Sequence, residues 1–175
     1  MRKHNFAFID IETSGPFLVR HEILEIGCVI TTPTLEIIEE FDYKIMPEHI
    51  ETADPISLKV NRYDPKNWQD AKTLMEVMEI ISVKVKGCIM VGHNVAFDSG
   101  FLEHSFHTTG ISNSMHYHKL DTISIAFAKL YKEADVEHFS LRELCLRFDI
   151  KNEQAHTGLG DARATFELYK KLMEL

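Results

Sequence analysis

Two acidic residues, Asp10 and Glu12, directly follow a run of apolar residues, Phe6–Ile9, near the start of the chain. The run has the length and composition of a strand that is buried on both faces. Successive strand side chains point to opposite faces, so Asp10 and Glu12 project from the same face. Two adjacent carboxylates repel each other, and desolvating them beside a core is costly without a cation or donors. The pair therefore predicts either a site for a hard divalent ion, such as Mg²⁺ or Mn²⁺, or a solvated strand end.

The size and composition of the chain are those of one globular domain. Its 175 residues are enough for a hydrophobic core, and we expect a single domain over residues 1–175. No apolar run has the length of a membrane span, and residues 1–5 lead into a strand rather than a signal peptide, so we expect a cytoplasmic protein. Three widely spaced cysteines, Cys28, Cys88 and Cys145, predict reduced core residues. The net charge of -8 argues against charge-driven coating of duplex nucleic acid.

The order of the predicted elements indicates an α/β fold. We predict strands at residues 6–9, 25–31, 35–41 and 88–91, and helices at about 68–86, 98–104, 121–132, 140–148 and 160–175. Three strands in sequence, followed by helices that alternate with a strand, predict a mixed sheet covered by helices.

Two further polar clusters follow later in the chain, at residues 91–98 and 156–161. Asp98 lies near a predicted helix start, where an acid alone favours an N-cap. Asp161 falls on the same helical face as Thr165 and Leu168, so it points toward the body of the protein and needs a partner. A metal site shared with Asp10 and Glu12 would supply one. The glycines at 158 and 160 predict a pliable segment before the last helix.

Three motifs occur in a fixed order: Asp-x-Glu-Thr after a strand, Gly-His-Asn-x-x-Phe-Asp in mid-chain, and His-x-x-x-x-Asp at the last helix. Together they resemble the DEDD exonuclease superfamily, and the histidine five residues before the last acid matches its DEDDh branch. That branch includes proofreading subunits of bacterial replicative DNA polymerases, ribonuclease T and oligoribonuclease. The resemblance extends from Phe6 to about Leu172. It implies one exonuclease domain with a ribonuclease H-like fold, in which helices cover both faces of a mixed sheet.

The resemblance also implies roles for five residues. Asp10 is similar to the carboxylate that bridges two metal ions in the family. Glu12 and Asp161 are similar to the ligands that complete the first metal site. Asp98 is similar to the acid that serves the second metal site. Two divalent ions, Mg²⁺ or Mn²⁺, ~3.5–4 Å apart can stabilise both the attacking and the leaving oxygen of a phosphodiester displacement. His156 is similar to the general base, although a lone histidine at this place would otherwise suggest a surface side chain.

Substrate contacts are also carried over from the resemblance, to Thr13, Ser14, His93 and Phe97. Phe17 or Leu18 would wedge against the terminal base, although this segment departs from the commoner Thr-Gly-Leu pattern. Residues 56–61 resemble a segment that lines the substrate groove, or else form a helical turn that packs on the sheet. In the third motif, Thr157-Gly158 replaces a common arginine-alanine pair.

The resemblance implies a metal-dependent 3′→5′ exonuclease that acts on 3′ ends of single-stranded DNA or RNA and releases nucleoside monophosphates. The alternatives are an oligoribonuclease or RNA-trimming enzyme, and a polymerase-associated binding subunit with weak activity. All five catalytic positions carry the required residue types, which argues against an inactive scaffold. We expect a DNA polymerase or a second copy of the chain as protein partner. We expect no association with a membrane. Two histidine pairs, His104/His107 and His116/His118, have the spacing of transition-metal ligands but lack further convincing ligands.

Overall fold

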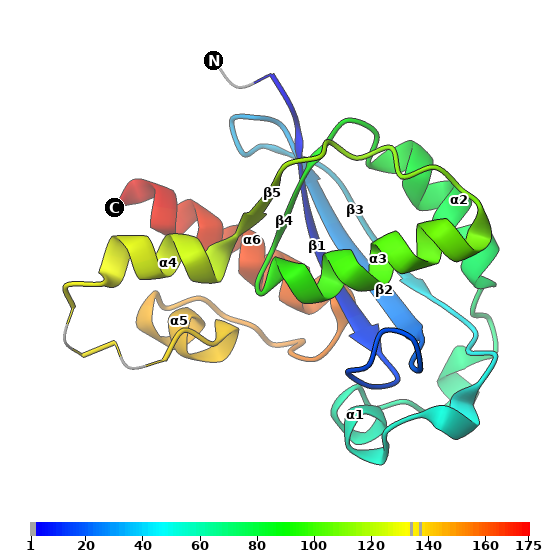
Figure 1. Cartoon of the computed structure of the whole chain (residues 1–175). Helices are drawn as coiled ribbons and strands as arrows, with labels where there is room; N and C mark the ends of the chain where they lie inside the picture. Colours follow the sequence, from blue (N-terminus) through cyan, green and yellow to red (C-terminus); the bar gives the residue numbers. More distant parts are fainter. Residues whose placement is uncertain (1–2, 134, 137) are drawn as a thin grey trace.

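A computed structural model describes residues 3–133, 135–136 and 138–175 of the chain. Met1 and Arg2, which belong to the segment used to argue against a signal peptide, lie outside these residues. The described part contains one five-stranded sheet with the strand order β3-β2-β1-β4-β5 (Figure 1). The strands are β1 (Phe6–Thr13), β2 (Ile23–Thr31), β3 (Ile37–Lys44), β4 (Ile89–Gly92) and β5 (Lys119–Asp121). No helix of the described part is long and apolar enough to cross a membrane.

The sheet is mixed, and β1 is its central strand. β1 pairs antiparallel with β2 over its whole length, whereas its parallel pairing with β4 covers only Phe6–Phe8. β2 pairs antiparallel with β3, and β4 pairs parallel with β5. The C-terminal half of β1, which carries Asp10 and Glu12, therefore has a strand neighbour on one side only.

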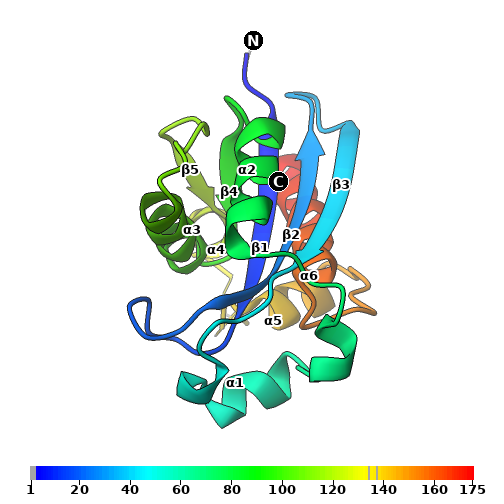
Figure 2. The same cartoon turned by 90° about the vertical axis from the view of Figure 1, so that its right-hand side faces the viewer.

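Helices cover both faces of the sheet, as the sequence predicts (Figures 1 and 2). The helices are α1 (Pro55–Val60), α2 (Leu74–Lys84), α3 (Val95–Thr109), α4 (Thr122–Leu130), α5 (Leu141–Arg147) and α6 (Gly158–Glu174). One core cluster joins alternate β1 residues, such as Ile9, to α2 and α3. A second joins the other β1 residues, Phe6 and Phe8, to Phe166 and Tyr169 of α6. Asp10 and Glu12 have the parity of Phe6 and Phe8, and so belong to the face that α6 covers.

Several helices and strands begin at other residues than the sequence predicts. The helix expected over 68–86 begins only at Leu74, because Thr73 and Glu76 form a capping box there, and Pro65–Trp68 is a separate 3-10 helix. The strand expected from residue 35 begins at Ile37, since Leu35 has a left-handed backbone (φ 67°) in the preceding turn. Strand β5 was not expected, because three residues with an exposed lysine carry no clear alternation. The three cysteines are buried and unpaired, as expected.

Candidate active site

Three carboxylates meet at the C-terminal end of β1. Asp10 and Glu12 come from the strand and Asp161 from the first turn of α6, and one oxygen of each lies within 4.8 Å of the others. All three side chains are partly buried. This group is the only set of His, Cys, Asp or Glu in the described residues that is placed to hold a metal ion. The convergence predicted from the inward face of the last helix is therefore present.

The start of α6 is pressed against the backbone of β2, and this contact brings Asp161 to the sheet. A Cβ atom built on Gly27 would lie 1.9 Å from the carbonyl carbon of Gly158, so only glycine fits there. Beside this contact, the Gly158 N–H donates to Oε1 of Glu25 at 2.7 Å. Glu25 is buried and lies opposite Glu12 in the β1–β2 register. The sequence analysis missed Glu25; the signal that could have found it is its place opposite Glu12 in an antiparallel pair.

Asp98 lies on the other side of β1. Its side chain is buried in α3, and its Oδ1 accepts a hydrogen bond from the Ile11 N–H at 3.0 Å. That N–H belongs to the half of β1 that β4 does not pair, so Asp98 satisfies a strand donor. The N-cap of α3 is Asn94, which has a left-handed backbone, so the capping role considered for Asp98 is excluded. Asp98 is not one of the three convergent carboxylates, but its charge acts on Asp10.

Burial favours the protonated forms of Asp10, Glu12 and Asp98 when no cation is present, and repulsion between carboxylates adds to this effect at Asp10 and Glu12. Burial, and then the carboxylates of Asp98 and Asp161, raise the pKa of Asp10 well above its ordinary value. The same two causes, burial first and then the charges of Asp161 and Glu25, raise the pKa of Glu12 to about 8. Burial raises the pKa of Asp98 to about 7, against the opposing effect of the Ile11 hydrogen bond. An all-oxygen donor set with excess negative charge fits Mg²⁺ or Mn²⁺.

His156 lies at the edge of this cluster. Its backbone is left-handed (φ 65°), and its N–H donates to Oδ2 of Asp161 at 3.1 Å. The side-chain amide of Asn152 donates to the other oxygen of Asp161. The His156 side chain is exposed, and its ring makes no hydrogen bond with the described residues. The imidazole is therefore free to turn toward a substrate.

The expectation of a glycine-rich, pliable loop around His156 is wrong. Gly158 and Gly160 lie inside the first turn of α6, and Thr157 is its N-cap, with Oγ1 accepting from the Gly160 N–H at 3.1 Å. The Thr157-Gly158 pair that replaces arginine-alanine thus serves the helix start: the threonine caps the helix and the glycine allows its contact with β2.

The residues predicted to contact substrate have different surroundings. Thr13 Oγ1 donates to the Gly15 carbonyl, and Ser14 Oγ accepts from the Glu22 N–H, so both side chains shape the loop after β1. The His93 ring contacts Thr122 Oγ1 and the Phe139 carbonyl, both at 2.9 Å, and burial lowers its pKa. With both nitrogens engaged, the His93 ring joins β4, α4 and the segment before α5. Phe97 is partly buried and lines a cavity.

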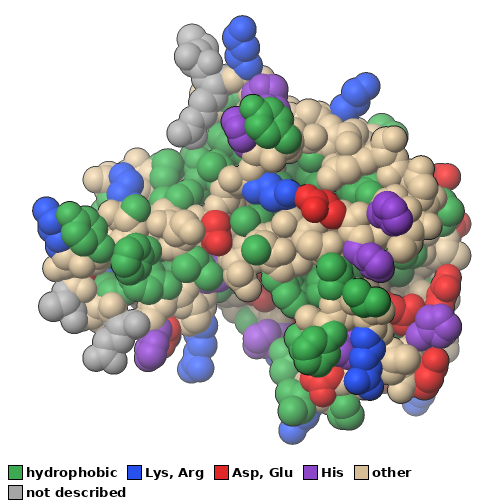
Figure 3. All heavy atoms as spheres, viewed as in Figure 1, with side chains coloured by type: hydrophobic (Ala, Val, Ile, Leu, Met, Phe, Trp, Pro, Cys, Tyr) green, Lys and Arg blue, Asp and Glu red, His purple; other side chains and the backbone are tan. Residues whose placement is uncertain are grey.

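Two cavities flank the three carboxylates. The first, of about 230 Å³, is lined by Glu12, Thr13 and Phe97 together with Ile56, Ser57, Val60 and Asn61. The second, of about 450 Å³, is lined by Asp161 and His156 together with residues of α5. In Figure 3 the surface is hollowed between the part that contains α5 and the part that contains α1. Instead of packing on the sheet, α1 has no buried residue, and Asn61 after it donates to the Thr13 carbonyl.

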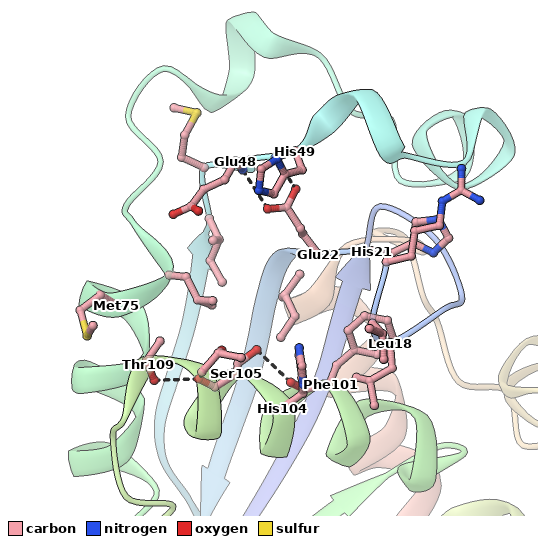
Figure 4. A pocket seen from close by; sticks show the side chains of 17 residues that line it. Leu18, His21, Glu22, Glu48, His49, Met75, Phe101, His104, Ser105 and Thr109 are labelled. Carbon is pink, nitrogen blue, oxygen red and sulfur yellow. Dashed lines mark hydrogen bonds between the residues drawn. The ribbon is translucent and has the colours of Figure 1, made fainter.

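The other candidates do not form metal sites. His104 lines a separate cavity of about 410 Å³ between α3 and the β1–β2 loop, where Glu22 accepts hydrogen bonds from the backbone of Glu48 and His49 (Figure 4). The rings of His116 and His118 contact each other at a tilted angle, and His116 stacks on Tyr117. No third ligand completes a metal site with them among the described residues. Asp121 caps α4, as its position before that helix suggested.

The fold and the acidic site define a ribonuclease H-like nuclease. Residues 7–169 match the exonuclease family model RNase_T, so the chain belongs to this exonuclease family, as its three motifs predicted. Escherichia coli exonuclease I in complex with a dT13 oligonucleotide has the same fold, with a TM-score of 0.82 and 18% identity over 97% of this chain and 41% of that chain.

The curated relatives include bacterial DNA polymerases that are much longer than this chain. The PolC-type DNA polymerase III of Caldanaerobacter subterraneus subsp. tengcongensis is 30% identical over 174 residues, 97% of this chain and 12% of that protein. The Bacillus subtilis PolC-type polymerase is 28% identical over 99% of this chain and 12% of its own length. The chain thus spans about an eighth of these relatives.

Proposed function

We propose that the chain is a metal-dependent 3′→5′ exonuclease that removes nucleoside monophosphates from the 3′ end of single-stranded nucleic acid. The observation that carries the proposal is the convergence of Asp10, Glu12 and Asp161 at the open end of β1, in a chain of the exonuclease family. Such a set of partly buried carboxylates is costly in a protein that binds no cation.

Four residues would hold two divalent ions, Mg²⁺ or Mn²⁺. Asp10, Glu12 and Asp161 would complete one site, and Asp98, on the opposite side of β1, would serve the second with Asp10 shared between them. When bound, the ions supply positive charge to the attacking and leaving oxygens of the displacement. Each oxygen of Asp161 accepts one hydrogen bond, from Asn152 or from the His156 backbone, and keeps a second lone pair with which it could bind an ion.

His156 is the general base of the proposed reaction. Its imidazole lies beside Asp161, is exposed and makes no hydrogen bond with the described residues. A histidine titrates near neutral pH, so its neutral form can take a proton from the attacking water as the phosphodiester bond is cleaved.

The smaller cavity is the proposed site of the terminal nucleoside. It contains Phe97 and the apolar side chains of Ile56 and Val60, and it adjoins Glu12 and Thr13. An aromatic and apolar lining suits a base, which can stack without sequence preference. The dT13 complex of E. coli exonuclease I supports a single-stranded substrate, and the PolC-type relatives support a polymerase as partner. A second copy of the chain is the other partner that we propose. We also propose that residues 1–175 form a single exonuclease domain that acts in the cytoplasm.

A panel of end-labelled substrates tests this function. Single-stranded DNA, duplex DNA, RNA and dinucleotides are incubated with Mg²⁺ or Mn²⁺, each with a free or a phosphorylated 3′ end. We expect stepwise release of monophosphates from free 3′ ends and resistance of the 3′-phosphorylated strands. A preference for dinucleotides or RNA would favour the oligoribonuclease or RNA-trimming alternative. Cleavage of a circular single strand would contradict the exonuclease, and absence of all cleavage would favour the binding subunit.

A further inference from the structure

Three long stretches of the chain contain neither aspartate nor glutamate, although the chain has 27 of these residues. They are residues 1–9, 80–97 and 104–120. Backbone hydrogen bonds join the three stretches at the N-terminal end of β1. The Ile89 N–H donates to the Asn5 carbonyl at 2.9 Å. The His116 N–H donates to the Cys88 carbonyl, also at 2.9 Å. Basic and aromatic side chains that are far apart in the sequence therefore meet at this end of the molecule.

Four aromatic rings lie next to one another there. They belong to His4, His116, Tyr117 and His118, and the centroids of the rings in contact are 4.0–4.9 Å apart. Tyr117 is 79% exposed, so its ring is open to solvent. In Figure 3, histidine and hydrophobic side chains gather at the upper end of the molecule, where the N-terminus lies. An exposed cluster of rings offers the bases of an unpaired strand a surface on which to stack.

Two lysines beside the rings carry charge that no acid neutralises. Lys3 precedes His4, and Lys86 precedes Gly87, whose carbonyl lies 3.2 Å from Nδ1 of His4. Both lysines are exposed, and neither makes an ion pair or a hydrogen bond with the described residues. Unpaired lysines beside stacked rings suit the phosphates of a nucleic acid strand.

The two other lysines of the three stretches are paired with acids from outside them. Lys84 pairs with Glu39, and Lys119 pairs with Glu103. These two acids are therefore neutralised and do not oppose the charges of Lys3 and Lys86.

We propose that these rings and unpaired lysines bind single-stranded nucleic acid at a surface separate from the three carboxylates. This ring surface consists of Lys3, His4, Lys86, His116, Tyr117 and His118. It lies at the N-terminal end of β1, whereas the carboxylates lie at the other end (Figure 1). A strand rises ~3.3 Å per residue, so Phe6 and Glu12 are roughly 20 Å apart. The inference does not rest on the proposed exonuclease function, because the ring surface contacts the interior of a strand and needs no 3′ end.

Other occupants suit the ring surface less well. Bases must be unpaired to stack on side chains, and the net charge of -8 disfavours duplex nucleic acid. Lysine is depleted in protein interfaces, whose centres are apolar, whereas Tyr117 is flanked by two histidines and lies in a cluster with unpaired lysines.

A circular single strand tests the ring surface without engaging an exonuclease site, because a circle has no 3′ end. Fluorescently labelled circles of deoxythymidylate and of uridylate are titrated with the protein in a chelating buffer, and binding is followed by fluorescence anisotropy. The variants are Tyr117→Ala, Tyr117→Phe and Lys86→Ala. Tyr131→Ala is the matched control, because Tyr131 is a 63% exposed tyrosine beside a lysine. Ile56→Ala is the second control, because Ile56 is an exposed residue of the smaller cavity beside the carboxylates.

We expect Tyr117→Ala to weaken binding of the circles by about fivefold or more, the usual effect of losing the stacking of one base. Tyr117→Phe should bind as wild type, because it keeps the ring. Lys86→Ala should reduce the slope of log K against log salt concentration by about 0.7, the value for one phosphate contact with a single strand. Tyr131→Ala and Ile56→Ala should bind as wild type.

Failure of the wild-type chain to bind either circle would overturn the inference and favour a protein partner at the ring surface. Equal losses in Tyr117→Ala and in either control would also overturn it, because the strand would then not be held by the ring surface. Binding of a circle by a chain that releases no monophosphates from linear strands would support the ring surface and overturn only the proposed function. Thermal unfolding followed by circular dichroism checks the fold of each variant, and Lys86→Ala provides an independent test if Tyr117→Ala unfolds.

Discussion

At the residue scale, the acids of the site make different contacts. Asp10, Glu12 and Asp161 present oxygens to one another, whereas one oxygen of Asp98 accepts a hydrogen bond from the Ile11 N–H. One oxygen of Glu25 accepts a hydrogen bond from the Gly158 N–H, so Glu25 positions α6 and is not one of the three convergent carboxylates. The acids therefore differ in what their oxygens contact: three carboxylates face one another, whereas Asp98 and Glu25 each accept a hydrogen bond from a backbone N–H. The second oxygen of Asp98 remains for the proposed second ion.

Replacing Asp10 tests whether this residue is a ligand of both proposed metal sites. Asp10→Asn keeps the size of the side chain but removes the charge that both proposed metal sites share. We expect loss of nearly all hydrolysis and of most Mn²⁺ binding, measured by isothermal titration calorimetry. Asp42→Asn is the control, because Asp42 is a nearby acid on β3 outside the three convergent carboxylates. Unchanged Mn²⁺ binding by Asp10→Asn would contradict the assignment.

Replacing His156 separates proton transfer from metal binding. His156→Ala should lower turnover by roughly 10²–10⁴-fold while Mn²⁺ affinity and KM stay close to wild type, because the base acts only on the way to the transition state. The rise of rate with pH through the histidine titration should disappear in the variant. If the variant keeps both its turnover and the same pH profile, the imidazole takes no part in the reaction.

At the scale of elements, the contact between α6 and β2 decides whether Asp161 reaches β1. Gly27→Ala would place a Cβ atom 1.9 Å from the Gly158 carbonyl carbon, so the helix start must move. We expect a loss of about 1–3 kcal/mol in the free energy of unfolding, the usual effect of overpacking, together with weaker Mn²⁺ binding. Urea unfolding and calorimetry measure the two effects.

The control for this substitution is Gly100→Ala in α3, where a Cβ atom would meet nothing within 4 Å. Alanine favours a helix over glycine by roughly 0.5–1 kcal/mol, so this variant should be slightly more stable than wild type and should bind Mn²⁺ equally well. Equal behaviour of the two variants would show that the close approach of α6 to β2 does not position Asp161.

The elements also show how far the sequence alone can lead. Alternation and helical periodicity predict that Asp10 and Glu12 share a face and that Asp161 points inward, and the structure brings these three together. Local patterns cannot reveal the partners of Glu25 or His93, because those bonds join segments 133 and 29 or 46 residues apart. Nor could spacing show that the last helix, expected from residue 160, begins at Gly158, since the small size of that glycine serves a contact with β2.

At the scale of the whole molecule, the acids couple stability to pH and to metal. The pKa of Glu12 is raised from 4.5 to about 8, and that of Asp98 from 3.8 to about 7, chiefly by burial. A carboxyl whose pKa is higher in the folded state than in the unfolded chain stabilises the fold while both states are protonated. That contribution is lost as the pH rises through the folded-state value. The metal-free protein should therefore become less stable between about pH 4.5 and pH 8.

Thermal unfolding in a chelating buffer, followed by circular dichroism across this pH range, measures the effect. We expect Tm to fall toward pH 8 without divalent ions, and the fall to be reduced by Mg²⁺ or Mn²⁺, which bind the ionised site of the folded state. Glu12→Gln removes one titrating group and should flatten the metal-free profile, whereas Glu36→Gln, an exposed acid in the turn before β3, should leave it unchanged. A metal-free Tm that stays level over this range would show that the carboxylates ionise in the folded state as easily as in the unfolded chain. A Tm that rises would show that they ionise more easily in the folded state. Either result would contradict the raised pKa values on which this prediction rests.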